Sequence, residues 1–196
     1  MDTDRQRRWI DRHGGNDTIG DPSPFVREAL ALLGPVPAGL APRALDVACG
    51  RGRHALAMAA AGYAVDAVDY ALPALQTLRG HAARRGLTIR CLAADVTTWP
   101  LPPARYALVV VVSFLERSLH PALRAAVAPG GALLIETFAR DAAAPVAPER
   151  ALAPGELDAE CAGWQVLARR DLHVEHAGRL AARTGILARR PASAPH

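Results

Sequence analysis

Short apolar segments alternate with helical segments between residues 44 and 138, and this alternation is the feature that most restricts the fold. Five segments have the length and apolar content of strands: 44–48, 64–68, 87–92, 106–112 and 132–138. Helical patterns separate most of them, at 53–61, 72–85 and 119–127. Strands joined through helices pair in parallel and are covered on both faces. The sequence therefore predicts an α/β fold, a three-layer sandwich around a mostly parallel sheet.

The two ends of the chain differ from this alternating part. A first helix is expected after Pro22, with Ser23 as its cap and Pro24 in its first turn. Near the other end, the strand-like segments 164–168 and 180–187 follow one another without a helix. Successive strands of this kind pair as an antiparallel hairpin, which we place at the sheet edge, for a total of about seven strands.

Length and composition favour one domain. With 196 residues, of which 51% are hydrophobic, the chain is large enough for a single core. We expect a mobile N-terminal arm or possible lid at 1–21, a single domain at 22–190 and a disordered tail at 191–196. Trp9 is the main aromatic residue of that arm.

Composition also restricts location and partners. The apolar run 107–112 is far too short to cross a membrane, and the charged N-terminus has no apolar segment of a secretory signal. Three cysteines without regular spacing form neither a disulfide framework nor a zinc motif. We therefore expect a cytoplasmic protein without a membrane partner. The net charge of +4 comes from scattered arginines without a recognition motif, so no nucleic-acid partner is expected, and the protein is predicted to be a monomer or homodimer.

Candidate ligand-binding residues stand where the first three strands end, which is where open α/β sheets bind ligands. Gly50 and Gly52 lie in the loop that leads from the first strand to the next helix, and this loop brings free N–H groups toward a ligand. Asp69 ends the second strand and is placed to accept the two hydroxyls of a ribose. Asp95 follows the third strand and is placed to accept an amine from an adenine.

These segments resemble the motifs of class I S-adenosylmethionine-dependent methyltransferases, near the small bacterial type related to tellurite-resistance methyltransferases. The similarity is carried by four stretches: 45–53 (Leu-Asp-Val-Ala-Cys-Gly-Arg-Gly-Arg), 65–69 (Val-Asp-Ala-Val-Asp), 94–96 (Ala-Asp-Val) and 128–134 (Ala-Pro-Gly-Gly-Ala-Leu-Leu). The resemblance implies a Rossmann-like fold and S-adenosylmethionine as cofactor. It implies the following cofactor-binding residues: Asp46, Ala48, Gly50, Gly52, Asp69, Tyr70, Asp95 and Val96.

The resemblance also implies how these residues divide the cofactor. The two glycines would pass its methionine part, and Asp46 would orient the amino group, through water. Asp69 would hold the ribose, while Asp95 and the Val96 backbone would hold the adenine. Ala48 stands where many members have glycine, although alanine also occurs there.

The acceptor side departs from the family. The segment 113–117 (Ser-Phe-Leu-Glu-Arg) replaces the asparagine-aromatic-leucine-histidine-arginine run of close relatives, so no catalytic residue is assigned. We consider Ser113, Phe114, Glu116 and Arg117 as substrate contacts, with a loop that only covers the sheet as the alternative. Methyl transfer from a sulfonium is an in-line displacement that orientation alone accelerates strongly, so it needs no histidine. The expected activity is methyl transfer to a small molecule or a metalloid oxyanion.

Two other functions stay open at this stage. Gly50 and Gly52, with Ala55 and a later acid, also satisfy the fingerprint of a nicotinamide-dinucleotide-dependent oxidoreductase. A non-catalytic cofactor-binding module of the same fold is the third possibility. No metal is expected, because His173 and His176 are predicted to lie in a solvated link.

Overall fold

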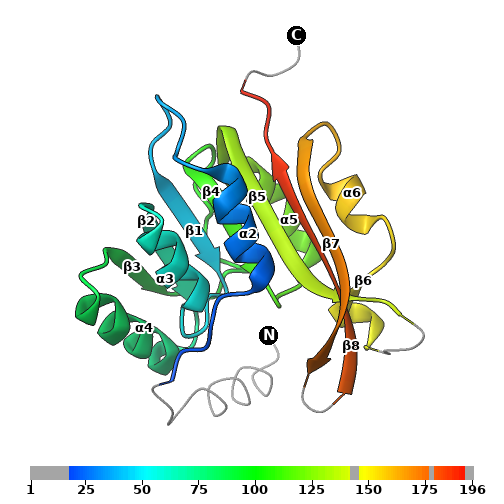
Figure 1. Cartoon of the computed structure of the whole chain (residues 1–196), viewed down its shortest axis with the longest axis horizontal. Helices are drawn as coiled ribbons and strands as arrows, with labels where there is room; N and C mark the ends of the chain where they lie inside the picture. Colours follow the sequence, from blue (N-terminus) through cyan, green and yellow to red (C-terminus); the bar gives the residue numbers. More distant parts are fainter. Residues whose placement is uncertain (1–17, 142–145, 177–178, 193–196) are drawn as a thin grey trace.

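Helices cover both faces of one sheet in the computed structural model, which describes residues 18–141, 146–176 and 179–192 (Figure 1). The helices are α2 (Pro24–Leu33), α3 (Arg53–Ala60), α4 (Leu72–Arg84), α5 (His120–Ala126) and α6 (Glu156–Glu160), with short 3₁₀ turns η1 (Arg117–Leu119) and η2 (Pro148–Arg150). The strands are β1 (Arg43–Val47), β2 (Ala64–Asp69), β3 (Ile89–Ala93), β4 (Tyr106–Val112), β5 (Val127–Ala139), β6 (Ala151–Leu152), β7 (Gln165–His176) and β8 (Arg179–Arg189).

The strand order is β3-β2-β1-β4-β5-β8-β7, with the two-residue β6 paired to β5. All pairs from β3 through β5 are parallel, whereas β8 is antiparallel to both β5 and β7. This topology confirms the predicted parallel sheet with an antiparallel hairpin at its edge. The order reverses between β1 and β4, and such a switch point opens a ligand crevice at the carboxyl ends of the strands.

Two hydrophobic clusters hold the three layers together. On one face, α2, α3 and α4 pack on the sheet through residues such as Phe25, Met58 and Leu78. On the other face, α5 and α6 pack through residues such as Leu123 and Leu157 (Figure 1). Every residue of β4 is buried, as its continuous apolar sequence predicts for a central strand covered on both faces.

The hairpin is longer than its apolar segments indicated. β7 extends to His176 and β8 begins at Arg179, so most of the polar stretch expected to be a link belongs to the strands. An edge hairpin with a solvent-facing side accepts polar residues, because its hydrogen bonds come from the partner backbone. The prediction that His173 lies in a solvated link was therefore wrong. The side chain of His176 lies outside what the structure describes.

The start of β5 also differs from the prediction. The strand begins at Val127 and includes the turn expected to precede it, with a register irregularity opposite β4. A Cβ on Gly131 would come within 2.9 Å of the Ala107 and Ala128 carbonyl oxygens, so this close approach requires glycine.

The first helix agrees with the prediction. Ser23 caps α2 by accepting the Phe25 N–H at 3.2 Å, and Pro24 occupies the first turn. The proposed arm lies outside the described residues except for 18–21, and so does most of the proposed tail, 193–196. None of the helices within the described ranges is long and apolar enough to cross a membrane.

Candidate active site at the carboxyl ends of the strands

The glycine loop between β1 and α3 is built from left-handed backbone. Ala48, Gly50 and Gly52 have φ angles of 52°, 53° and 77°. A Cβ on Gly52 would lie 2.4 Å from the Leu78 Cδ1 atom, so helix α4 packs directly on this turn. The loop therefore needs glycine at position 52 both for its φ angle and for its packing, while Ala48 adopts a conformation that costs a non-glycine residue about 1–2 kcal/mol.

Asp69 at the end of β2 holds this loop in place. Its Oδ2 atom accepts the Gly50 N–H at 2.8 Å, and its Oδ1 atom accepts the Ala71 N–H at 2.8 Å. The carboxylate is buried, and Tyr70 beside it is half-buried. Asp69 thus lies against the glycine loop, as the sequence predicts, and it also organises the backbone of that loop.

Asp46 in β1 is a buried carboxylate with an unused oxygen. It is 1% exposed and accepts a hydrogen bond from the Ala55 backbone N–H in the first turn of α3. Among the described residues, nothing donates to its Oδ2 atom. Burial raises the pKa of Asp46 to about 7, and the nearby Asp69 carboxylate adds to that rise. The site therefore contains an acceptor oxygen without a donor.

The third strand ends in a smaller turn. The Asp95 Oδ1 atom accepts the Thr97 backbone N–H at 2.9 Å and the Thr97 hydroxyl at 2.7 Å, which shapes the chain after β3. Val96 packs into the core below. Since β3, β2 and β1 are neighbours, these residues share one edge of the sheet with the glycine loop.

A polar network that is buried except for Ser113 lies next to that edge, beside the end of β4. Ser113 directly follows β4 with a left-handed φ of 59°, and its N–H donates to the Glu136 carbonyl at 2.8 Å. Arg183 of β8 donates from Nη2 to the Ser113 hydroxyl at 2.9 Å and from Nε to the Glu136 carboxylate at 3.0 Å. The Ser23 hydroxyl donates to the other Glu136 oxygen. Non-glycine residues with left-handed backbone cluster at functional sites, and Ser113 is in that position here.

The other acceptor-side candidates take structural roles. Glu116 accepts the Ser118 hydroxyl at 2.7 Å and caps η1. Arg117 pairs with Glu156 of α6 and donates to the Ala151 carbonyl at 3.0 Å, so it holds the β6–α6 segment. Phe114 is half-buried against the core on that side. Of the four candidates, only Ser113 joins the polar network beside the sheet edge that carries the glycine loop.

Sequence reasoning missed three residues of this region. Glu136 and Arg183 are 47 positions apart, and only the pairing of β5 with β8 brings them together. His54 in the first turn of α3 is buried, and its Nε2 atom has no partner among the described residues. Burial, with Arg53 and Arg183 nearby, lowers the pKa of His54 to about 3, so this imidazole is neutral. The one local signal in the sequence for this network was Glu136, an acidic residue inside the otherwise apolar strand β5.

The cysteines and histidines form no metal site in the part of the chain that the structure describes. Cys49 and Cys161 are buried and Cys91 is half-buried, and burial raises the pKa of all three thiols. His173 pairs with Asp141 at 2.8 Å.

A family model described as a methyltransferase domain matches residues 44–131, the segment that carries the glycine loop, Asp69 and Asp95. Residues 44–131 therefore form a methyltransferase domain. This finding confirms the family that the sequence resembles, and it favours the methyltransferase over the nicotinamide-dependent alternative.

Individual relatives agree with this domain assignment. The chain is 29% identical over 150 residues to the ubiquinone biosynthesis O-methyltransferase of Azotobacter vinelandii, covering 68% of this chain and 59% of that protein. TehB from Haemophilus influenzae has a similar structure, with a TM-score of 0.74 and 21% identity over 85% of this chain and 61% of that one. So does the 1,6-didemethyltoxoflavin-N1-methyltransferase of Burkholderia thailandensis, solved with S-adenosylhomocysteine, with a TM-score of 0.61 and 19% identity over 96% of this chain and 83% of that one. The chain spans 35% to 59% of the length of the curated relatives that it matches.

The methyltransferase domain has residues that fit its family's cofactor, S-adenosylmethionine. The unused Oδ2 atom of Asp46 is an acceptor for an amino group, and burial makes an unpaired carboxylate oxygen costly without one. The left-handed loop around Gly50 and Gly52 keeps side chains away from the same edge. The unused acceptor oxygen of Asp46 thus suits a ligand that bears an ammonium group.

Proposed function

We propose that this domain transfers the methyl group of S-adenosylmethionine to a small-molecule nucleophile by in-line displacement. The observation that carries the proposal is the buried Asp46 carboxylate, whose Oδ2 atom has no donor among the described residues beside the glycine loop. When bound, the cofactor supplies an electrophilic methyl group with a neutral thioether leaving group.

The sequence-predicted residues have separate roles in this proposal. Asp46 orients the amino group of the cofactor, and the loop of Ala48, Gly50 and Gly52 lets the methionine part pass close to the backbone. Asp69 accepts the ribose hydroxyls, because an ionised carboxylate offers about four lone-pair sites. Tyr70 borders the ribose, and Asp95 and Val96 border the adenine. These residues lie along one edge of three adjacent strands, which supports this division.

On the acceptor side, we infer that the exposed Ser113 faces the nucleophile. Arg183 donates to the Ser113 oxygen, so the Ser113 proton is left to donate elsewhere. Orientation of the acceptor supplies the catalysis, because a well-placed nucleophile gains roughly 7–11 kcal/mol over a diffusing one. A proposed small acceptor agrees with the small organic molecules for which the Azotobacter and Burkholderia relatives are named. The acceptor screen described below therefore includes oxyanions beside small organic molecules.

Calorimetry with S-adenosylhomocysteine tests the cofactor site. Asp69→Ala is expected to weaken binding by roughly 1.5–3 kcal/mol, the contribution of hydrogen bonds to a charged group. Glu149→Ala, which removes an exposed carboxylate from η2, serves as the control and keeps wild-type affinity. Equal affinities in the wild type and Asp69→Ala would overturn the assignment of Asp69.

A methyl-transfer screen tests the reaction. Thiols, chalcogen oxyanions, thiopurines and small amines are incubated with S-adenosylmethionine, and S-adenosylhomocysteine is measured. Turnover with at least one of these classes is expected. Tight cofactor binding without turnover on any acceptor would support the non-catalytic module instead.

A further inference from the structure

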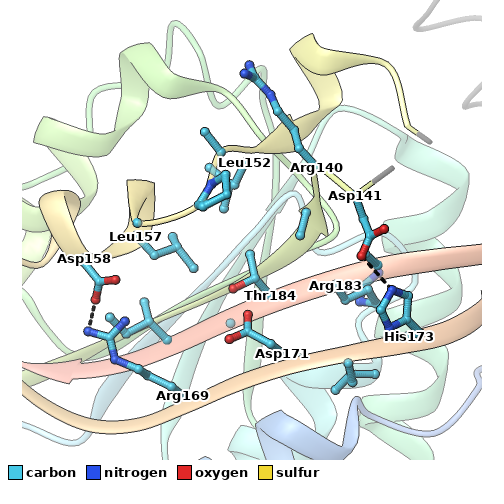
Figure 2. Close-up of a pocket in the computed structure, with 18 residues that line it drawn as sticks. Arg140, Asp141, Leu152, Leu157, Asp158, Arg169, Asp171, His173, Arg183 and Thr184 are labelled. Atoms are coloured by element: carbon cyan, nitrogen blue, oxygen red, sulfur yellow. Dashed lines mark hydrogen bonds and ion pairs between the residues drawn. The ribbon is translucent and has the colours of Figure 1, made fainter. Parts of the chain in front are cut away.

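A pocket lies between the β7–β8 hairpin and the segment that carries β6 and α6 (Figure 2). Its volume is about 390 Å3. The hairpin forms its floor, Leu152 and Leu157 form a wall, and the end of β5 at Ala139–Asp141 closes a third side. None of the residues predicted to bind the cofactor or the acceptor lines it.

The floor presents alternate side chains of the hairpin. Side chains two positions apart on a strand share a face, which puts Arg169, Asp171 and His173 of β7 on one side. In the hairpin register, Asp171 is opposite Thr184, and both point into the pocket in Figure 2. Ile186 lies below them and is fully buried, and the apolar lining that a ligand can reach comes from residues such as Ala153 and Pro154.

Two ion pairs close the ends of the pocket and leave one carboxylate between them. Arg169 pairs with Asp158 of α6 at one end, and His173 pairs with Asp141 at 2.8 Å at the other (Figure 2). The Asp171 carboxylate forms neither a side-chain hydrogen bond nor an ion pair with any described residue, although the Asp171 backbone is part of the β7–β8 ladder. The carboxylate at the centre of the floor is therefore not neutralised by Arg169, which pairs with Asp158 instead.

The remaining cations of the lining are directed elsewhere. Arg183 donates to the Glu136 carboxylate at 3.0 Å, in the network beside the cofactor edge. Figure 2 shows the Arg140 side chain extending away from Asp171. The unpaired charge that a ligand meets on the floor of the pocket is thus the negative charge of Asp171.

We propose that this pocket binds a small organic cation with an apolar body. The ammonium group pairs with Asp171 and donates to the Thr184 hydroxyl oxygen, while the apolar part covers Ala139, Ala153 and Pro154, which line the pocket and expose surface. The walls of a concave site shield a charge pair from water on several sides, so the pair contributes more to binding than a pair on an open surface. This site is separate from the proposed methyl-transfer site and stands without it.

Three probes of equal size test the charge preference: benzylammonium, benzyl alcohol and benzoate. Each is titrated into the isotopically labelled protein at neutral pH, and the backbone amide signals of Asp171, Thr184 and Ile186 are followed by NMR. Benzylammonium is expected to shift these signals and to bind at least tenfold more tightly than benzyl alcohol, and benzoate is expected to bind most weakly. Equal affinities of the three probes would overturn the proposal.

Asp171→Asn keeps the size of an exposed side chain and removes its charge, so the fold is retained, as unchanged amide signals elsewhere will show. It is expected to lower the affinity for benzylammonium about tenfold, to the level of benzyl alcohol. Glu149→Gln, which removes a carboxylate outside the pocket, is expected to have no effect. Wild-type affinity in Asp171→Asn contradicts the assignment of the ammonium site.

Saturating S-adenosylhomocysteine separates this site from the cofactor site. Benzylammonium is expected to bind equally well with and without it. Competition between the two would place the probe at the cofactor edge and would overturn the proposal of a separate pocket. Loss of methyl-transfer activity, by contrast, has no bearing on this result.

Discussion

Arg183 donates from its Nη2 atom to the Ser113 hydroxyl at 2.9 Å and thereby joins the edge hairpin to the end of the central strand β4. The same guanidinium pairs with Glu136, and both side chains of that pair are about nine-tenths buried. One residue of β8 therefore sets the charge balance and the geometry beside the proposed acceptor position.

Arg183→Met is expected to lower the free energy of unfolding by about 3–5 kcal/mol, because it leaves the buried Glu136 carboxylate without its cation. Urea denaturation at pH 7 measures this change. The double variant Arg183→Met/Glu136→Gln removes the uncompensated charge and keeps an acceptor for Ser23, so it is expected to recover most of the loss. If the double variant is as unstable as the single one, lost packing rather than charge explains the effect.

Asp46→Asn is expected to stabilise the ligand-free protein above pH 7. The pKa of Asp46 is raised from 3.8 to about 7, so the folded state keeps a proton that the unfolded state has released. The contribution of this group to stability is complete below pH 4 and is lost as the pH rises to about 7. The variant lacks that loss, and its advantage at pH 8 is on the order of 4 kcal/mol from a shift of about three pH units.

Urea denaturation of both proteins at pH 4.5, 6 and 8 follows this difference. The gap between variant and wild type should widen with pH. The control Glu149→Gln, at an exposed position, should show no such widening. A gap that is constant with pH contradicts the raised pKa of Asp46.

Cofactor binding at pH 6 is expected to release close to one proton from Asp46. At this pH the carboxyl is mostly protonated in the free protein, and an ammonium beside it favours the ionised form. Calorimetric titration with S-adenosylhomocysteine in buffers of different ionisation enthalpy measures the number of protons released. Asp46→Asn should bind more weakly and release none. Equal proton release in the two proteins would exclude Asp46 as the partner of the amino group.

The glycine loop gives two substitutions with opposite expected effects. Ala48→Gly relieves a left-handed alanine, which costs about 1–2 kcal/mol, and adds about 0.5–1 kcal/mol of glycine entropy, so the net gain is up to about 1.5 kcal/mol. Gly52→Ala places a Cβ against the fully buried Leu78 and is expected to cost about 2 kcal/mol or more. Thermal denaturation measures both. A lower melting temperature of Ala48→Gly would contradict strain at that position.

Local pattern was sufficient for the sheet and for one side of the site. Burial on both faces gives β4 a continuous apolar sequence, and the period of the helices follows from their packing on the sheet. The residues proposed to bind the cofactor stand in short contiguous stretches because each is at the end of one strand. Asp46, Gly50 and Asp69 therefore appeared in the sequence in the order in which the strands end.

The acceptor side could not be predicted in the same way. Arg117 has the position and charge of a substrate contact, yet Glu156, which is 39 residues away, pairs with it. Glu136, Arg183 and Ser23 come from three distant segments, and no spacing in the sequence relates them. The length of the hairpin was underestimated for a related reason, since polar residues of β7 are stabilised by the backbone of β8.

The amino-acid sequence by itself determined the order of strands and helices, the glycine loop and the acidic residues at the strand ends, because these depend on local periodicity and on backbone conformation. Only the tertiary structure decided which charges are paired, which carboxylate oxygen lacks a donor and where a pocket opens. Those features depend on contacts between segments that are far apart in the chain, and their energies depend on burial, which a local pattern does not define.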